Sequence, residues 1–302
     1  MKVFVAGATG TVGKAIVRAL LASHHQVFAM ARSKEKGEEL AKIGSIPVYT
    51  DAFDAKSVQD AIVSSRPDAV INMLTALPKE YTPESMRAAA EMNEKLRTVG
   101  GANLQAGAKF SGVRRFIMQS AAFWYAPGKG LAAEEEPFAF SATPGIAAGC
   151  RTYRDLERAV LDDRELDAVA MRYGFFYGPG TWFEKGQSIA NQVFAGKLPL
   201  IGEGKGIWNF VHVDDAARAT AAALNEPVGV YNINDDHPIA MHAWLPAYAR
   251  QLGAPKPPHI SIEEGLRLRG PDTVYYANEL RAASNAKAKR LLLFKPRRLE
   301  WL

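Results

Sequence analysis

The sequence predicts an α/β fold: a Rossmann-type, doubly wound parallel sheet with a smaller C-terminal α/β lobe. Strand-like apolar runs alternate with helical patterns over residues 1–180, and a glycine-rich turn joins the first run to the first helix. We expect residues 1–180 to form the dinucleotide-binding domain, completed by about 208–235. Residues 181–207 and 236–302, where the pattern is irregular, are expected to form a substrate-binding lobe.

The first element is the apolar run Val3–Val5, which breaks at Gly7 and is followed at once by a helical pattern. Gly7, Gly10 and Gly13 have the spacing G-x-x-G-x-x-G. A bound dinucleotide needs a sharp turn, close approach of the backbone to the pyrophosphate, and tight packing of helix on strand. The free N–H groups at the helix start then bind the phosphates. The residues assigned to this contact are Gly7, Thr9, Gly10, Thr11, Val12 and Gly13.

The second run, His25–Ala31, is followed by Arg32 and Lys34, with no acidic residue before Glu35. An acidic side chain at this junction would accept hydrogen bonds from the free ribose 2′-hydroxyl of NAD. Arg32 can instead bind a 2′-phosphate with its fork, and Lys34 can add a second positive charge. We therefore predict NADP, with NAD less favoured. The alternative is that both side chains only cap the end of a strand.

The third run, Ile46–Tyr49, is followed by Asp51 and Asp54. An acidic side chain here can accept a hydrogen bond from the adenine amino group, or can cap the helix expected at Lys56–Val63. We assign the adenine contact to Asp51 and the helix cap to Asp54.

Three further strands are expected at Asp68–Leu74, Val113–Met118 and Leu166–Arg172, and a long helix from about Pro83 to Gly107 follows the first of them. A later helix is expected at Asp214–Leu224, with Asp214 as its N-cap. In parallel sheets of this kind, ligands bind at the carboxyl ends of the strands. Polar side chains at these ends are therefore candidate site residues: Thr75, Ser120 and Tyr177.

Composition narrows the class of protein. The chain has 302 residues, 48% of them hydrophobic, and a net charge of +5, as in an ordinary globular protein. We expect no secretory signal and no membrane span, because no apolar stretch is long enough. The single cysteine, Cys150, fits a reducing cytoplasm. With no metal motif and a modest charge, we predict no metal and no nucleic-acid partner.

Several motifs follow one another along nearly the whole chain. They are GATGTVG at the start, Asn93 in the long helix, RYGFFYGPG at Arg172–Gly180, WNFVHVDDAARA at Trp208–Ala219, VYNIND at Val230–Asp235 and SNAKAKRLL at Ser284–Leu292. Together they resemble the extended short-chain dehydrogenase/reductase superfamily, in its NAD(P)-dependent epimerase/dehydratase branch. The resemblance implies that the glycines hold the pyrophosphate and that Asn93 is structural. It also implies that Tyr173–Pro179 lies near the nicotinamide and the substrate.

The family's catalytic pattern is a serine after the fifth strand and a Y-x-x-x-K on the next helix, where the lysine lowers the tyrosine's pKa. This sequence departs from it. No Y-x-x-x-K occurs within Ala147–Leu161; Gly149 falls at the tyrosine position and Tyr153 at the lysine position. Ala121 falls at the serine position, with Ser120 one residue earlier. The chain therefore resembles atypical members that keep the cofactor fold and lack the usual acid/base pair.

Hydride transfer to a carbonyl still needs a proton donor near the substrate oxygen. The candidate catalytic residues are Ser120, Tyr153 and Tyr177, and each has a purely structural alternative. Ser120 and Tyr153 are also expected to contact the cofactor, together with Thr75 and Tyr173.

Three functions are consistent with these residues. The first is an NADP-dependent reductase or dehydrogenase acting on a small carbonyl or alcohol with a relocated acid. The second is a redox-sensing binding protein resembling the NmrA-like regulators. The third is a sugar-nucleotide epimerase or dehydratase, whose chemistry depends most on the missing tyrosine. We favour the first, with a small-molecule substrate, and by analogy with the superfamily we expect a homodimer that pairs long helices.

Overall fold

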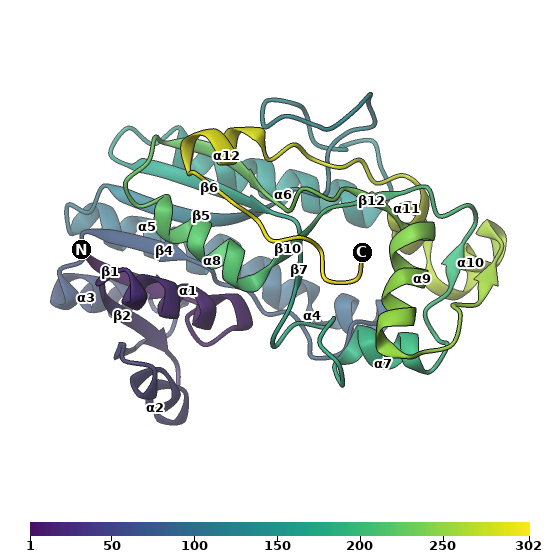
Figure 1. The fold of residues 1–302 in the computed structure, drawn as a ribbon. Coiled ribbons are helices and arrows are strands. Elements are labelled where there is room, and N and C mark those ends of the chain that lie inside the picture. Colours follow the sequence, from purple (N-terminus) through teal and green to yellow (C-terminus); the bar gives the residue numbers. More distant parts are fainter.

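The computed structural model describes all 302 residues and contains a seven-stranded parallel sheet in the order β11-β6-β5-β4-β1-β2-β3 (Figure 1). The chain winds outward from β1 in both directions, which is the doubly wound arrangement predicted from the sequence. The strands of this sheet are β1 (Lys2–Ala6), β2 (Gln26–Ala31), β3 (Ile46–Tyr49), β4 (Ala69–Asn72), β5 (Arg115–Ala121), β6 (Asp167–Tyr173) and β11 (Gly229–Ile233).

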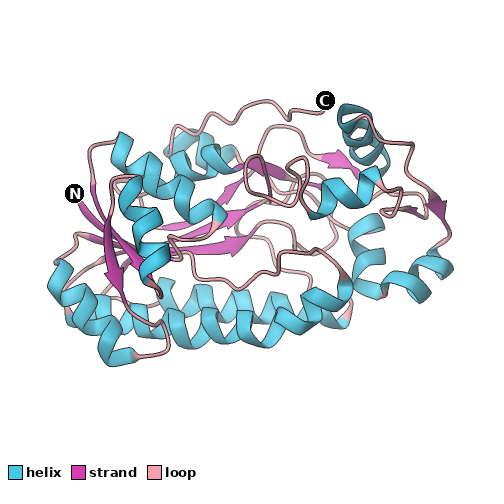
Figure 2. Cartoon of the chain, turned by 90° about the horizontal axis from the view of Figure 1, so that it is seen from below, coloured by secondary structure: helices cyan, strands magenta, loops and turns pink.

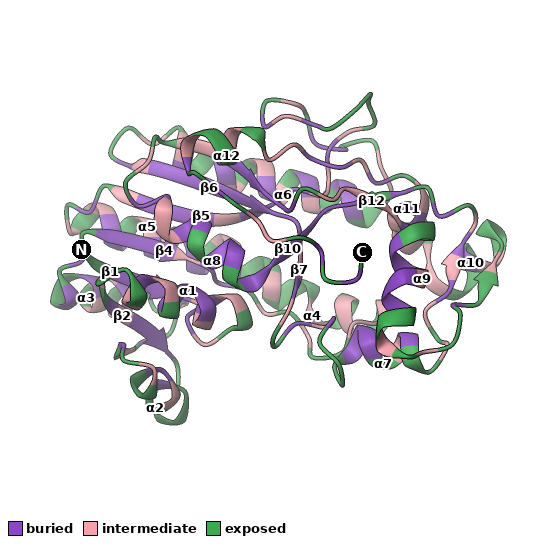
Figure 3. Cartoon of the chain, in the orientation of Figure 1, coloured by how far each residue is buried: buried purple, intermediate pink, exposed green.

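Helices cover both faces of the sheet (Figure 2), and the strands between them are buried (Figure 3). Apolar side chains of α1 and α8 pack on one face, and those of α3, α5 and α6 on the other. Burial on both faces explains why the strands read as continuous apolar runs. The helices are α1 (Thr11–Ala22), α2 (Lys34–Lys42), α3 (Ala55–Ser65), α4 (Pro83–Lys95), the π-helix η1 (Leu96–Gly100), α5 (Gly101–Phe110), α6 (Pro144–Leu161), α8 (Val213–Ala222) and α12 (Ala286–Leu291).

The remaining elements pack around an aromatic core beyond the carboxyl ends of the strands. The C-terminal tail, yellow in Figure 1, brings Trp301 into this core, with its ring centroid 5.1 Å from Phe210 and 4.9 Å from Tyr248. These elements are β7 (Phe175–Tyr177), α7 (Ser188–Phe194), β8 (Leu200–Ile201), β9 (Ile207–Trp208), β10 (Phe210–His212), β12 (Ile239–Ala240), α9 (Met241–Leu252), β13 (His259–Ile260), α10 (Ile262–Arg269) and α11 (Pro271–Asn278).

Two helix starts test the predicted caps. Asp54 caps α3 as predicted, with its Oδ1 accepting from the Ser57 N–H at 2.9 Å. The prediction that Asp214 is the N-cap of α8 was wrong. Its N-cap is His212, whose Nδ1 accepts from the N–H of Asp214 at 3.1 Å. The imidazole at the end of β10 caps the first turn, so the helix begins at Val213, and Asp214 lies inside that turn instead of at its N-cap.

Candidate functional site

The turn between β1 and α1 has the geometry of a phosphate-binding loop. Gly7 has a φ of +77°, and a Cβ there would meet the carbonyl oxygen of Met73. A Cβ at Gly13 would meet the carbonyl oxygen of Gly7, so helix and strand are in direct backbone contact. Gly10 differs: it is exposed, and a Cβ there would lie 3.4 Å from its nearest neighbour, the Gly7 oxygen. The fold therefore requires Gly7 and Gly13, whereas the space over Gly10 is open to a ligand. The other predicted loop residues lie half-buried beside it: Thr9 and Val12.

The first N–H groups of α1 are available to an anion. α2 and α3 begin with side-chain caps from Ser33 and Asp54, but Gly10, the N-cap of α1, has no side chain. Uncapped N–H groups and the helix dipole together favour a phosphate. Thr11 Oγ1 donates to the carbonyl oxygen of Gly180 at 2.9 Å, which ties the helix start to the loop after β7. This geometry fits the pyrophosphate of a nicotinamide dinucleotide.

The residues predicted for the adenosine end lie at the surface near the ends of β2 and β3. Arg32 is exposed and makes no hydrogen bond or ion pair, and Lys34 approaches only Glu38, at 4.0 Å. Asp51 is also exposed, and its Oδ1 accepts from the N–H of Phe53 at 3.0 Å within its own loop. The guanidinium of Arg32 is therefore free to bind a ligand.

Thr75 lies just beyond β4 and is held by α4. Its Oγ1 donates to Oδ1 of Asn93 at 2.7 Å, and the N–H of Ala76 donates to the same oxygen at 3.0 Å. Asn93 thus fixes the backbone that follows β4, while Thr75 remains exposed.

Ser120 lies in a buried polar network. It is 5% exposed, and its Oγ donates to Glu157 Oε1 at 2.6 Å. Arg172 donates to both oxygens of Glu157, from Nε at 2.7 Å and from Nη2 at 2.6 Å. Its Nη1 donates to the hydroxyl oxygen of Tyr125 at 2.7 Å and to the carbonyl oxygen of Glu134 at 2.9 Å. The network joins α6 to β5 and β6, and the hydroxyl proton of Ser120 is used within it.

Tyr173 and Tyr177 are packed inside the protein, 1% and 0% exposed. The hydroxyl of Tyr173 lies 2.6 Å from Oγ1 of Thr220 on α8. Tyr177 donates weakly to the carbonyl oxygen of Arg298, at 3.4 Å, and its ring lies 5.0 Å from that of Trp301. Burial raises the pKa of both phenols. In this structure neither side chain is open to a cofactor or a substrate.

Tyr153 lies on α6 next to the position that lacks the family's tyrosine. At that position, Gly149, an added Cβ would lie 2.5 Å from two indole carbons of Trp124. The indole therefore fills the space in which a tyrosine side chain would start. The ring centroids of Tyr153 and Trp124 are 5.5 Å apart. Burial raises the pKa of Tyr153, and the positive charge of Arg97 opposes this rise.

An aromatic wall lies where β5 and β6 end; it consists of Phe123, Trp124, Phe175, Trp208 and Tyr276. Phe123 stacks on Phe175, with ring centroids 4.5 Å apart and planes at 19°. Phe175 in turn stacks on Trp208, at 4.2 Å and 28°. Because Phe123 follows β5 and Phe175 follows β6, the wall lies at the edge of the sheet where ligands bind. Phe123, Trp124, Phe175 and Tyr276 remain partly exposed, and aromatic side chains of this kind can contact a planar aromatic ligand.

Tyr276 on α11 supplies a phenol that the sequence analysis missed. Its oxygen accepts a hydrogen bond from Nε1 of Trp124 at 2.8 Å, which leaves its own proton free to be donated. Burial raises its pKa well above the usual value, so the phenol stays neutral. Tyr81 and Tyr153 lie near enough to interact with it electrostatically. No motif marks this residue, and 152 positions separate it from its partner Trp124.

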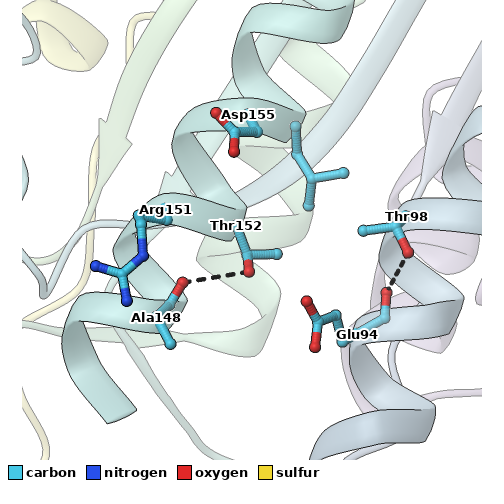
Figure 4. Close-up of a pocket in the computed structure, with 7 residues that line it drawn as sticks. Glu94, Thr98, Ala148, Arg151, Thr152 and Asp155 are labelled. Carbon is cyan, nitrogen blue, oxygen red and sulfur yellow. Dashed lines mark hydrogen bonds between the residues drawn. The ribbon is translucent and has the colours of Figure 1, made fainter. Parts of the chain in front are cut away.

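A hollow of about 430 Å³ lies between α4–η1 and α6 (Figure 4). None of the predicted site residues lines it, and five of its seven lining residues are polar or charged. The lining residues are Glu94, Thr98, Ala148, Arg151, Thr152, Asp155 and Leu156. Elsewhere, no group of three or more His, Cys, Asp or Glu side chains is arranged to hold a metal ion. None of the helices combines the length and the apolar sequence of a transmembrane segment.

Two curated relatives are reductases. A "3-diazoavenalumate denitrifying reductase" from a Streptomyces species is 39% identical over 306 residues, covering 100% of this chain and 98% of the relative. A "2-alkyl-3-oxoalkanoate reductase" from Stenotrophomonas maltophilia is 26% identical over 275 residues, covering 85% of this chain and 77% of the relative.

Solved structures and a family model agree on the fold. The UDP-glucose 4-epimerase of Thermotoga maritima with UDP-glucose superposes with a TM-score of 0.75 at 17% identity, covering 100% of this chain and 95% of that one. The dTDP-glucose 4,6-dehydratase of Streptomyces venezuelae with NAD has a TM-score of 0.76 at 20% identity, covering 99% and 93%. The model of the NAD dependent epimerase/dehydratase family matches residues 3–234. This chain therefore belongs to the NAD-dependent epimerase/dehydratase family.

Proposed function

We propose that this chain is an NADP-dependent reductase of a small aromatic acceptor, an aryl diazo compound in its diazonium form. The observation that carries the proposal is the 39% identity, over the whole chain, to 3-diazoavenalumate denitrifying reductase. The aromatic wall supports it, because its partly exposed rings can contact a planar substrate. The Gly7–Gly13 loop would hold the pyrophosphate, and bound NADPH would supply a hydride.

A diazonium acceptor removes the need for the missing acid/base pair. A carbonyl that accepts a hydride gains negative charge on oxygen and needs a proton donor. An aryldiazonium ion is already positive. Addition of the hydride to its terminal nitrogen gives a neutral aryl diazene, which loses N₂ and keeps the transferred hydrogen on the ring. The balance needs no proton from the protein, so Gly149 and Ala121 at the usual tyrosine and serine positions are compatible with this reaction.

The first test compares a benzenediazonium salt with acetophenone in the presence of NADPH. We expect the protein to accelerate NADPH oxidation and N₂ release with the diazonium salt only. With NADPH deuterated at the transferred position, the deuterium should appear in the benzene product. The uncatalysed reaction is subtracted with heat-denatured protein. Turnover of the ketone without turnover of the diazonium salt would reject the proposed acceptor.

The second candidate is the small carbonyl acceptor expected from the sequence, and the oxoalkanoate reductase relative favours it. Here a phenol must donate the proton. The candidates are Tyr276, which belongs to the aromatic wall, and Tyr153, whose ring centroid lies 5.5 Å from that of Trp124. For a carbonyl, we expect Tyr153→Phe or Tyr276→Phe to lower kcat roughly 100-fold or more. For a diazonium acceptor we expect little change in kcat, because no proton is transferred. Measuring kcat of both variants with each acceptor separates the two mechanisms.

We propose NADP rather than NAD because the Arg32 guanidinium is exposed and unpaired beside the end of β2. Arg32→Ala is expected to weaken NADPH binding about 10-fold or more, the usual effect of losing a charge-assisted hydrogen bond. The affinity for NADH should stay nearly unchanged. Titration of each cofactor against protein fluorescence measures the two dissociation constants. An equal loss for both cofactors would remove the argument for a 2′-phosphate contact.

The other two functions considered for this sequence give distinct results. Recovery of an isomerised sugar nucleotide without net cofactor turnover would support an epimerase. Tight NADPH binding without turnover of any acceptor would support a redox-sensing regulator.

We further propose a cytoplasmic homodimer. None of the 13 residues of α4 is buried, which leaves one side of this helix available to a second copy beside the hollow of Figure 4. A mass measurement by light scattering should give twice the chain mass of 32.9 kDa. The cytoplasmic location rests on the single cysteine.

A further inference from the structure

Arg97, on the π-helix η1, has a guanidinium without an acidic partner. Its Nε is buried and has no hydrogen-bond acceptor. Leaving a half-buried cation without a counter-charge costs free energy, which a bound anion would recover. Arg172, Arg281 and Arg297, whose side chains are also partly or fully buried, pair with the carboxylates of Glu157, Glu136 and Asp215. Arg115, which like Arg97 has no carboxylate partner, donates to the carbonyl oxygen of Glu226 instead.

The guanidinium lies at one end of a row of aromatic rings. Its carbon is 4.8 Å from the ring centroid of Tyr153, and that ring is 5.5 Å from the ring of Trp124 in the aromatic wall. The polar group beside it is the neutral hydroxyl of Tyr153. Tyr153 thus lies between the cation and Trp124, so a ligand that extends from the wall along Tyr153 would bring its far end to the guanidinium.

We propose that Arg97 binds an anionic substituent, a carboxylate, of the aromatic acceptor and so positions its ring. This inference rests on the proposed function and adds the substrate class to it: an aromatic acid. A guanidinium fork matches a carboxylate with two parallel hydrogen bonds. The phosphates of the dinucleotide are a second source of negative charge, but we assign those to the start of α1 and to Arg32.

The test uses two probes that the enzyme does not reduce, 4-hydroxybenzoate and its methyl ester, titrated into the NADPH complex and followed by tryptophan fluorescence. We expect the acid to bind about 10- to 100-fold more tightly than the ester. Arg97→Met should weaken binding of the acid until its affinity equals that of the ester, and should leave the affinity for the ester unchanged. Arg97→Lys should recover part of the preference for the acid. Arg151→Met, which removes an exposed arginine from α6, is the matched control and should change the affinity for neither probe.

A kinetic readout then separates positioning from a structural role. With 4-carboxybenzenediazonium, Arg97→Met should raise KM about 10-fold or more and change kcat little. Equal binding of acid and ester by the native protein, or absence of acid binding, would overturn the proposal. So would loss of NADPH affinity in Arg97→Met, because the anion would then belong to the cofactor. Acid preference without diazonium turnover rejects the proposed function alone, and turnover without acid preference rejects this inference alone.

Discussion

A Gly10→Val variant is expected to lose binding of both NADPH and NADH and to keep its fold. Gly10 has φ −75° and ψ 167°, which valine adopts readily, and its Cβ would be in ordinary contact with the Gly7 oxygen. The added side chain would instead occupy the space over the uncapped N–H groups of α1. Losing two charge-assisted hydrogen bonds to phosphate weakens binding on the order of 100-fold or more.

Gly13→Val is the contrasting variant on the same loop. Its Cβ would meet the backbone of Gly7 and Ala8, so the helix must move away from the strand. We expect it to lose about 1–3 kcal/mol of folding free energy or more, together with the cofactor site. Urea denaturation and NADPH titration of both variants separate the two effects. Tight cofactor binding by folded Gly10→Val protein would remove the assignment of the glycine loop.

The fold and the cofactor loop could be predicted because their signals are local. A buried strand, a turn that only glycine can make and an amphipathic helix follow one another within Lys2–Ala22, and each is encoded by neighbouring residues. The observed order of the strands is the usual one for a doubly wound sheet of this class. Asp54 as a helix cap is the same kind of signal, since the capped N–H lies three residues away.

The acid/base candidates depend on side-chain direction, which the sequence does not fix. Successive residues of a strand face opposite sides, so the neighbours Gln119 and Ser120 reach different partners: Gln119 donates to the carbonyl oxygen of Leu74, and Ser120 to Glu157. Tyr177 is covered by the distant C-terminal residue Trp301. These contacts join segments that are far apart in the chain, and no rule of residue spacing predicts them.

The surroundings of Trp124 also could not be predicted from the sequence. The sequence shows a glycine where the family has tyrosine, but not that an indole fills the space. Nor does it show that this indole orients Tyr276. The polar groups around the aromatic wall are therefore properties of the folded chain, whereas the absence of Y-x-x-x-K is a property of the sequence.

Arg172→Met is expected to cost about 3–5 kcal/mol of folding free energy, because it leaves the Glu157 carboxylate buried without its counter-charge. The side chains of this pair are 7% and 6% exposed, and water cannot replace the lost hydrogen bonds. Tyr125 and the carbonyl of Glu134 lose their donor as well. Removing both charges together, in Arg172→Met with Glu157→Leu, should restore part of the stability, since no buried ion then remains unpaired.

The chain offers a matched control where β5 and β6 begin, at the opposite end of β6 from Arg172. Arg114 and Asp167 form the same two-bond arrangement, at 3.1 Å and 2.9 Å, but their side chains are 58% and 44% exposed. Because water screens this pair, Arg114→Met should cost no more than about 1 kcal/mol. Urea denaturation of the three variants gives the comparison directly. If the two single substitutions cost the same, burial does not set the energy of the Arg172–Glu157 pair.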